Sequence, residues 1–216
     1  MSLSTLILIF IVLFLAILIR MLYTYFKFKY QKPFVVLMRG TESVDKNFEK
    51  IVSSNEFILP DIKNGDELGI TFAFKIFIEN AMENRNWGRR FDQLKTIINY
   101  SPNVYYHPQE NYFSFDVEIK DNIQFQSQQS IKYDNPPLQT WLSMVVVFSS
   151  NRIQVYSNNE LVVNKKLKNP PIFRTKDLKI GEKNNNFFGE LGPVLYWSYP
   201  LKPTEISNAS YELEFY

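Results

Sequence analysis

The sequence begins with an apolar run that is typical of membrane proteins. Residues Leu6–Ile19 include no polar side chain, and the apolar stretch continues from Leu3 to Phe26, broken by Arg20 and Thr24. As a helix, the shorter run would measure about 21 Å and the longer one about 36 Å. Because the hydrocarbon core of a bilayer is about 30 Å thick, we expect one N-terminal membrane-spanning helix.

Two other interpretations of this run are a cleaved signal peptide and a buried helix of a globular domain. A signal peptide would begin with basic residues and end at a small-residue cleavage site, whereas this chain begins Met-Ser-Leu-Ser-Thr and lacks such a site. A buried helix is rarely apolar on every face for four turns. We therefore expect residues 1–28 to form an uncleaved transmembrane anchor with its juxtamembrane segment, and residues 29–216 to form one domain.

The basic residues beside the anchor predict its orientation. Arg20, Lys27, Lys29 and Lys32 all follow the apolar run, and no charged side chain precedes it. By the positive-inside rule the domain at residues 29–216 would lie on the cytoplasmic side, with these four side chains near the lipid headgroups. The sequons at Asn99 and Asn208 leave the outward orientation open as the alternative.

Charge and cysteine content exclude several classes of function. The chain carries 24 basic and 22 acidic residues, so after the four juxtamembrane cations are removed 24 − 4 = 20 basic groups face 22 acidic ones. A domain close to neutral gives no reason to expect nucleic acid as a partner. There are no cysteines, which excludes disulfides, thiolate metal sites and a cysteine nucleophile.

The rest of the chain has the pattern of an all-β domain. In Tyr112–Ile119 apolar and polar residues alternate, which predicts a strand with one wet face. Short helices are expected only at Thr41–Val52 and Ala81–Asn86. Further strands are expected at Pro33–Met38, Ile70–Ile78, Gln93–Tyr100, Val104–His107 and Ile123–Gln126, and then in a series of segments from Trp141 to the C-terminus.

Five motifs in the last third of the chain carry a resemblance. In order they are Trp141 before an apolar strand, Tyr156-Ser157-Asn158-Asn159 in a hairpin, Leu178-Lys179-Ile180-Gly181, Phe188-Gly189-Glu190-Leu191 with Val194 and Tyr196, and Leu201 with Glu205-Ile206. This order resembles the concanavalin A-like lectin/glucanase superfamily in its laminin-G-like form. The resemblance implies a two-sheet antiparallel jelly-roll sandwich, here preceded by one N-terminal transmembrane helix. Two departures are Asn159 in place of glycine, and Gly192-Pro193, which would interrupt strand pairing.

The sequence offers little material for catalysis or metal binding. Asp116 and Glu118 would share the wet face of one strand, but their spacing differs from the acidic motif of the glucanases, so we expect a solvated sheet face and no enzyme. His107 is the sole histidine, and neither the acidic loop 61–67 nor the Asn184–Asn186 segment has convincing calcium-ligand spacing. No cofactor is expected. Trp87, in a polar and basic loop, is the best candidate for an exposed contact residue, while Trp141 and Trp197 are expected in the core.

We therefore expect a non-catalytic, membrane-anchored structural or scaffolding protein whose sandwich contacts other proteins of an assembly. The AT-rich composition, the absence of cysteine and the short anchor resemble minor capsid or inner-membrane components of large DNA viruses, which would place the chain in an internal virion membrane. The alternative is an outward-facing lectin-like module that binds a glycan or a receptor.

Overall fold

The computed structural model describes residues 14–22, 34–45, 47–56, 68–79, 92–120, 126–173 and 176–216. The chain divides into two compact units, Met1–Pro33 and Phe34–Tyr216. In the first unit, residues 14–22 are helical and their side chains are exposed. No helix within the described residues is long and apolar enough to cross a membrane. The remainder of the expected span lies outside the described residues, so the anchor stays a prediction.

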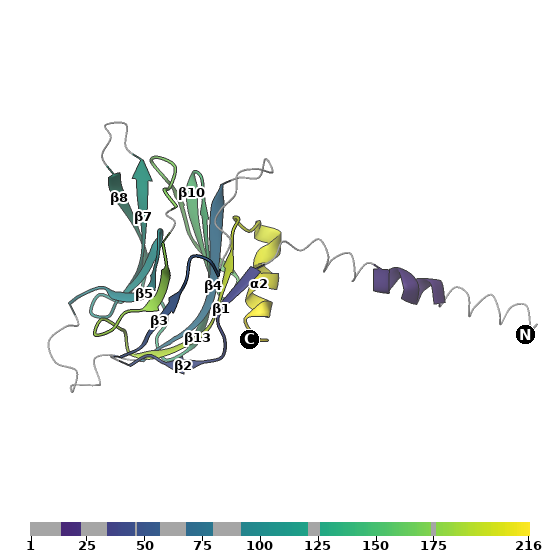
Figure 1. Cartoon of the computed structure of the whole chain (residues 1–216), viewed down its shortest axis with the longest axis horizontal. Helices are drawn as coiled ribbons and strands as arrows, with labels where there is room; N and C mark the ends of the chain where they lie inside the picture. Colours follow the sequence, from purple (N-terminus) through teal and green to yellow (C-terminus); the bar gives the residue numbers. More distant parts are fainter. Residues whose placement is uncertain are drawn as a thin grey trace, which may run out of the picture. The chain divides into compact units, whose positions relative to one another are not determined.

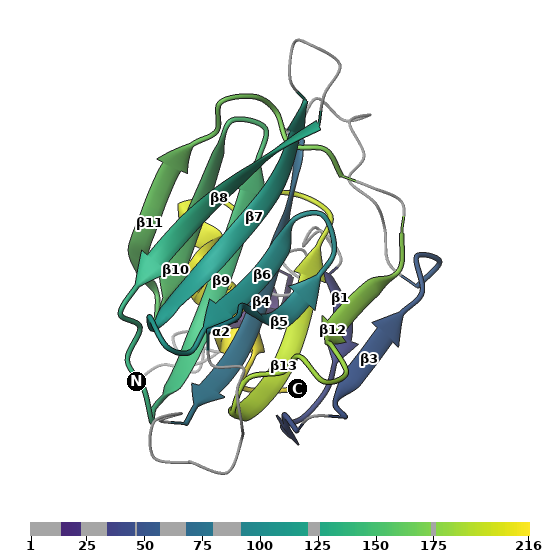
Figure 2. The same cartoon turned by 90° about the vertical axis from the view of Figure 1, so that its left-hand side faces the viewer.

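The second unit is a sandwich of two antiparallel sheets, as the sequence predicts (Figures 1 and 2). The seven-stranded sheet has the order β1-β13-β4-β9-β10-β11, with β2 also paired to β13, and the six-stranded sheet has the order β3-β12-β5-β6-β7-β8. The strands are β1 (Phe34–Met38), β2 (Glu42–Ser43), β3 (Glu49–Val52), β4 (Gly69–Ile78), β5 (Lys95–Asn99), β6 (Asn103–His107), β7 (Tyr112–Lys120), β8 (Gln126–Asp134), β9 (Trp141–Ser149), β10 (Arg152–Ser157), β11 (Glu160–Lys166), β12 (Leu178–Gly181) and β13 (Gly189–Trp197).

The main core lies between the two sheets and follows from the alternation of side chains along each strand. In β7, Phe113, Phe115 and Val117 belong to this core and are fully buried. Phe72 of β4 forms edge-to-face ring pairs with Tyr100 and Phe148. Aromatic pairs of this kind fill the space between the sheets and stabilise one packing arrangement.

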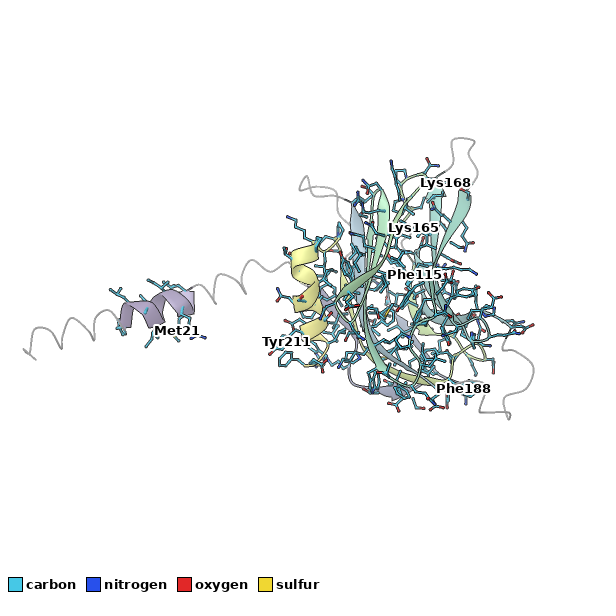
Figure 3. All side chains as sticks on the ribbon, turned by 180° about the vertical axis from the view of Figure 1, so that it is seen from behind. Met21, Phe115, Lys165, Lys168, Phe188 and Tyr211 are labelled. Carbon is cyan, nitrogen blue, oxygen red and sulfur yellow. The ribbon has the colours of Figure 1, made fainter. Side chains whose placement is uncertain are left out.

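A second apolar cluster covers part of the outer face of the seven-stranded sheet. Here a 3₁₀ turn, η1 (Pro203–Glu205), leads into helix α2 (Ile206–Glu212), which lies against the sheet (Figures 1 and 3). Ile206, Ala209 and Leu213 pack onto Ala73 of β4 and other outward-facing side chains. Where α2 covers the sheet, the outward-facing side chains of β4, β9 and β13 are therefore buried and apolar. The sequence analysis did not predict α2.

Most of the expected strands are present, but one expected helix is not. Thr41–Val52 forms β2 and β3 in place of a helix, because Glu49–Val52 pairs with β12 and Glu42–Ser43 pairs with β13. Of the expected strand at Ile123–Gln126, residues 123–125 lie outside the described residues, and Gln126 is the first residue of β8. The expected helix at residues 81–86 lies outside the described residues.

The five motifs of the last third take the places that the resemblance implies. Asn158 and Asn159 both have positive φ, at 50° and 70°, which is the conformation of a two-residue turn between β10 and β11. Gly181 at the end of β12 has a φ of 71°. At Gly192-Pro193 the pairing of β13 with β4 shifts register between Leu191 and Val194, so the expected interruption is a bulge within a continuous strand.

Candidate functional site

A strip of polar side chains crosses the outer face of the six-stranded sheet. We name it the Tyr105 strip and define it as Thr96, Tyr105, Ser114, Asp116, Gln128 and Glu182. The pairing of β5, β6 and β7 places Thr96 opposite Tyr105 and Tyr105 opposite Ser114. Since the neighbours of these residues along each strand face the core, the strip faces away from it. Three members are nonetheless buried, namely Thr96, Ser114 and Asp116.

Asp116 is held in a fixed position by two side chains of the strip. Ser114 Oγ donates to Asp116 Oδ1 at 2.7 Å, and Gln128 Nε2 donates to Asp116 Oδ2 at 2.7 Å. Only 5% of Asp116 is exposed. An ionised carboxylate has about four acceptor positions, so each oxygen of Asp116 retains capacity for a further donor.

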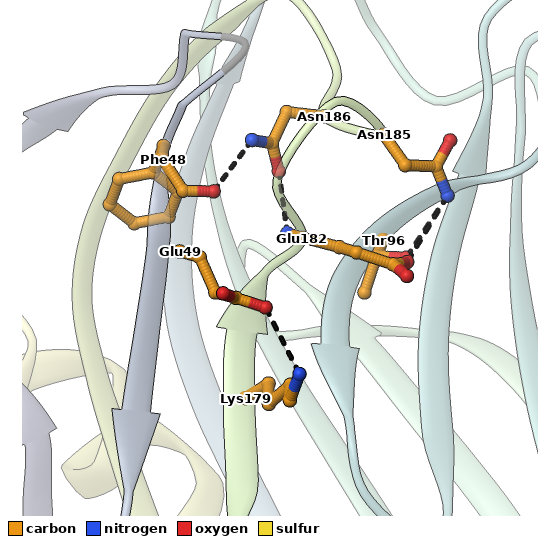
Figure 4. A network of polar contacts seen from close by, with 7 residues as sticks. All are labelled: Phe48, Glu49, Thr96, Lys179, Glu182, Asn185 and Asn186. Carbon is orange, nitrogen blue, oxygen red and sulfur yellow. Dashed lines mark hydrogen bonds and ion pairs between the residues drawn. The ribbon is translucent and has the colours of Figure 1, made fainter.

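Glu182, at the other end of the strip, is fixed in a similar way by residues of a loop. Thr96 Oγ1 donates to Glu182 Oε2 at 2.6 Å, and Asn185 Nδ2 approaches the same oxygen at 3.3 Å (Figure 4). Asn185 Nδ2 also lies 3.3 Å from Thr96 Oγ1. The Thr96 amide donates to the Asn185 carbonyl at 3.1 Å, so the loop after β12 is joined to β5 through backbone and side chains.

The same loop is anchored on its other side by Asn186, which is 6% exposed. Its Nδ2 donates to the carbonyl oxygens of Asp45 and Phe48, both at 2.7 Å, while its Oδ1 accepts from the Glu182 amide at 2.8 Å (Figure 4). One amide side chain therefore connects the segment before β3 to the backbone of Glu182. This contact positions Glu182 indirectly, through its main chain.

Tyr105 is paired with Thr96 on one side and Ser114 on the other, and these two residues hold Glu182 and Asp116. Burial raises the pKa of Tyr105, and the charges of Asp116 and Glu182 raise it further. Both effects favour the protonated phenol, which can therefore act as a hydrogen-bond donor. The strip thus combines two rigid acceptors, one phenol and the Gln128 amide, and the Asn185 amide lies beside it. Such a set can bind a ligand that has several hydroxyl groups.

The candidate residues predicted from the sequence lie mostly elsewhere. Trp87, Lys27, Lys29 and Lys32 are outside the described residues, and Arg20 is an exposed side chain of the 14–22 helix. The sequence analysis interpreted Asp116 as a solvated residue, which is wrong because the carboxylate is buried. It missed Tyr105, Gln128 and Glu182, since these residues come from two separate strands and one loop.

The expectations about metal ligands, histidine and tryptophan have mixed outcomes. No group of three or more His, Asp or Glu side chains in the described residues could hold a metal ion, and the acidic loop 61–67 is outside them. His107 is buried against Tyr112, with ring centroids 5.0 Å apart. Trp197 is in the core as expected, whereas Trp141 is 39% exposed and packs only partly, on Phe77.

Comparisons with known proteins support the fold and go no further. No protein-family model matches the sequence, and no curated protein matches it. Among solved structures, the binding domain of botulinum neurotoxin serotype G is similar at a TM-score of 0.61 and 15% identity, over 83% of this chain and 45% of that one. The receptor binding domain of botulinum neurotoxin D has a TM-score of 0.57 at 12% identity, over 85% and 48%.

A third similar structure is the binding domain of botulinum neurotoxin DC in complex with rat synaptotagmin II. Its TM-score is 0.56 at 16% identity, with 86% of this chain and 48% of that one covered. The chain thus spans less than half the length of these structures. At such low identity the likeness establishes a concanavalin A-like jelly-roll sandwich and leaves binding properties undecided.

Proposed function

We propose that the chain is a membrane-tethered, non-catalytic recognition module that binds a glycan through the Tyr105 strip, on a laminin-G-like form of the sandwich. The observation that carries this proposal is the register that places Tyr105 between Thr96 and Ser114, each of which fixes one carboxylate. Carbohydrates are recognised by such directional polar groups because each sugar hydroxyl can donate to a carboxylate and accept from an amide or phenol.

The rigidity of the two carboxylates favours binding. Each is already hydrogen-bonded to neighbours on the sheet or the loop, so little side-chain entropy is lost when a ligand arrives. The fold supports the same proposal more weakly, because the similar structures include receptor binding domains. Charge-assisted hydrogen bonds contribute about 1.5–3 kcal/mol each, so removing one should weaken binding roughly tenfold to a hundredfold.

The proposal is tested by screening the full-length protein in detergent micelles against a glycan array, followed by calorimetry with the best ligand. Tyr105→Ala, Asp116→Asn and Glu182→Gln should each lower the affinity by about tenfold or more. Gln154→Ala, on β10 of the other sheet, is the matched control and should bind like the parent protein. Binding that is equal in all four variants would exclude the strip, and a sugar product released during incubation would contradict the non-catalytic reading.

A second candidate function is the scaffolding role expected from the sequence. Leu161 and Val162, on the edge strand β11, are 48% and 36% exposed. An exposed apolar edge strand can add a strand from another protein, such as a component of a capsid or an inner virion membrane. Replacement of both residues by lysine should abolish a protein complex in cross-linking experiments, and it should leave glycan binding unchanged.

Membrane orientation separates the two candidates. The basic residues after the anchor favour a cytoplasmic sandwich, as scaffolding would require, whereas glycan binding at a cell surface requires the opposite side. Protease protection of the chain made in the presence of microsomes decides between them. A digested sandwich favours scaffolding, and a protected sandwich favours glycan recognition.

A further inference from the structure

The end of the sandwich where the chain enters it carries a group of exposed aromatic side chains. Of the four exposed aromatic residues in the described part of the sandwich, three lie within the last six residues, namely Tyr211, Phe215 and Tyr216. Tyr211 and Phe215 are each 63% exposed, and Tyr216 is 36% exposed. We name these three residues the C-terminal aromatic patch.

Tyr211 of the patch is on α2, and Phe215 and Tyr216 follow the end of the helix. The opposite face of the helix and the turn after it, with Ile206, Ala209 and Leu213, is already packed on the sheet. Tyr211 lies on the side of α2 that points away from the sandwich (Figure 3). Tyr211 and Phe215 contact each other edge to face, with ring centroids 4.8 Å apart. Their exposure therefore has no role in packing the fold.

The patch is next to the first residue of the sandwich. Phe34 packs on Tyr216 with ring centroids 5.8 Å apart, and on Trp197 at 5.2 Å. The Gly40 amide donates to the carbonyl oxygen of Tyr216 at 2.6 Å. The N-terminal strand and the C-terminal segment are thus joined at one corner of the domain, and this corner carries the patch.

Chain length limits how far this corner can be from the anchor. The apolar stretch ends at Phe26, eight residues before Phe34. Even a fully extended chain would span at most about 29 Å over that distance. If the anchor crosses a bilayer, the corner is held within reach of the headgroups, and the patch is close to it.

The charges beside the patch are compatible with an interface. Glu214 forms an ion pair with Lys75, and the guanidinium group of Arg39 lies 5.9 Å from the centre of the Tyr216 ring. Glu212 is a second acidic group beside the patch, which argues against attraction to strongly anionic lipid. Tyrosine and phenylalanine are favoured where a bilayer meets water, because their rings enter the acyl boundary while polar tips stay hydrated.

We propose that the C-terminal aromatic patch docks on the bilayer surface and fixes the sandwich against the membrane from which it is tethered. This proposal rests on the tether in the proposed function. The outward face of α2 then lies along the interface, with its aromatic rings inserted about 5–10 Å into the headgroup region. Docking would leave the Tyr105 strip, on the opposite sheet, free to face the aqueous phase.

Spin labelling tests this proposal directly, because the chain has no cysteine and each introduced one is unique. The full-length protein is reconstituted in phosphatidylcholine vesicles and labelled at Asn208→Cys, Ala16→Cys or Leu161→Cys in separate samples. Asn208 is exposed on α2, three residues before Tyr211, so both lie on the same face of the helix. A label at position 208 therefore reports on the docked face without replacing any residue of the patch. Ala16 reports on the tether, and Leu161, exposed on β11, is the aqueous control. Collision of each label with oxygen, relative to collision with a water-soluble nickel chelate, measures its depth.

We expect the oxygen-to-nickel ratio at position 208 to be several-fold above that at position 161. The double change Tyr211→Ser and Phe215→Ser should return it to the aqueous value without moving the ratio at position 16. A lipid-exposed label at position 16 with an aqueous one at position 208 would overturn docking and leave the tether intact. Aqueous labels at both positions would overturn the tether together with docking. A label at position 208 protected from both reagents would indicate a protein contact instead, and it would also overturn the proposal.

Discussion

The side chain of Asn186 gives the sharpest test of how the loop beside the candidate site is held. Asn186→Ala removes three hydrogen bonds, from Nδ2 to two carbonyl oxygens and from the Glu182 amide to Oδ1. All three partners are main-chain groups, and Asn186 is 6% exposed, so water replaces the lost bonds poorly. At about 1 kcal/mol for each bond, the free energy of unfolding should fall by about 3 kcal/mol.

This loss is measured by equilibrium unfolding in urea, monitored by circular dichroism. The midpoint should fall while the m-value stays unchanged, because the mutation alters stability and not the area exposed. In a thermal scan the same loss corresponds to a decrease in Tm of roughly 6–12 °C for a domain of this size. The control is Asn184→Gly, in the same loop, where Asn184 is exposed and has a φ of 66°. Glycine adopts that conformation without strain, so the control should change stability by less than about 0.5 kcal/mol.

Asn186→Asp extends the same reasoning to pH. An ionised carboxylate keeps the acceptor for the Glu182 amide but places a second oxygen against two carbonyl oxygens. The folded state then favours the protonated acid, so the pKa of the new side chain is raised above its usual value of about 4. The free energy of unfolding of this variant is highest below the usual pKa of about 4, and it falls as pH rises through the raised pKa of the folded state. If Asn186→Ala lowers the free energy of unfolding no more than Asn184→Gly does, the hydrogen bonds of Asn186 do not hold the loop. The same conclusion follows if the stability of Asn186→Asp shows no such pH dependence.

Three further predictions follow from the backbone and the buried phenols. Gly189→Ala should destabilise the sandwich by more than about 3 kcal/mol in urea titrations, because the new Cβ would lie 1.8 Å from a carbonyl oxygen of β4. The control is Gly40→Ala, whose new Cβ meets no atom within 4 Å. It should cost only about 1–2 kcal/mol of backbone strain. Asn159→Gly should raise the free energy of unfolding by about 0.5–1 kcal/mol, since it creates the favoured Asn-Gly hairpin turn at a positive φ; a decrease would contradict the turn geometry. Burial raises the pKa of Tyr100 and of Tyr106 to about 12. The folded state therefore keeps protons that the unfolded chain loses above about pH 10, so the free energy of unfolding should fall as pH rises from about 10 to about 12. Tyr100→Phe should make this alkaline decrease in stability less steep. An unchanged slope would contradict a raised pKa for Tyr100.

Local pattern was enough to predict most of the sandwich. The alternation in Tyr112–Ile119 placed one strand and its inward face correctly, because a strand half buried in a sheet needs a period of two. The Asn158-Asn159 turn was predicted for a similar reason, since asparagine tolerates a positive φ. Both features depend on residues that are neighbours in the sequence.

The wrong or missed predictions concern segments whose structure depends on residues far away in the sequence. Thr41–Val52 has the spacing of a short helix, yet its halves pair with β12 and β13, which lie more than a hundred residues away along the chain. The packing of α2 on the outer face of the seven-stranded sheet was missed for the same reason. Its apolar partners are on β4, β9 and β13, and no local window contains them together.

The sequence by itself determined the fold class, the direction of the side chains in Tyr112–Ile119, the turn at Asn158-Asn159 and the apolar N-terminal run. These follow from the periodicity, the φ preference and the hydrophobicity of adjacent residues. Only the tertiary structure decided the candidate site. Asp116 is a buried acceptor because the pairing of β7 with β8 brings it against Gln128. Glu182 joins the strip because Thr96 of β5 binds its carboxylate and Asn186 ties its loop to the segment before β3. Such contacts join groups that are far apart in the chain, so no local sequence pattern encodes their distances.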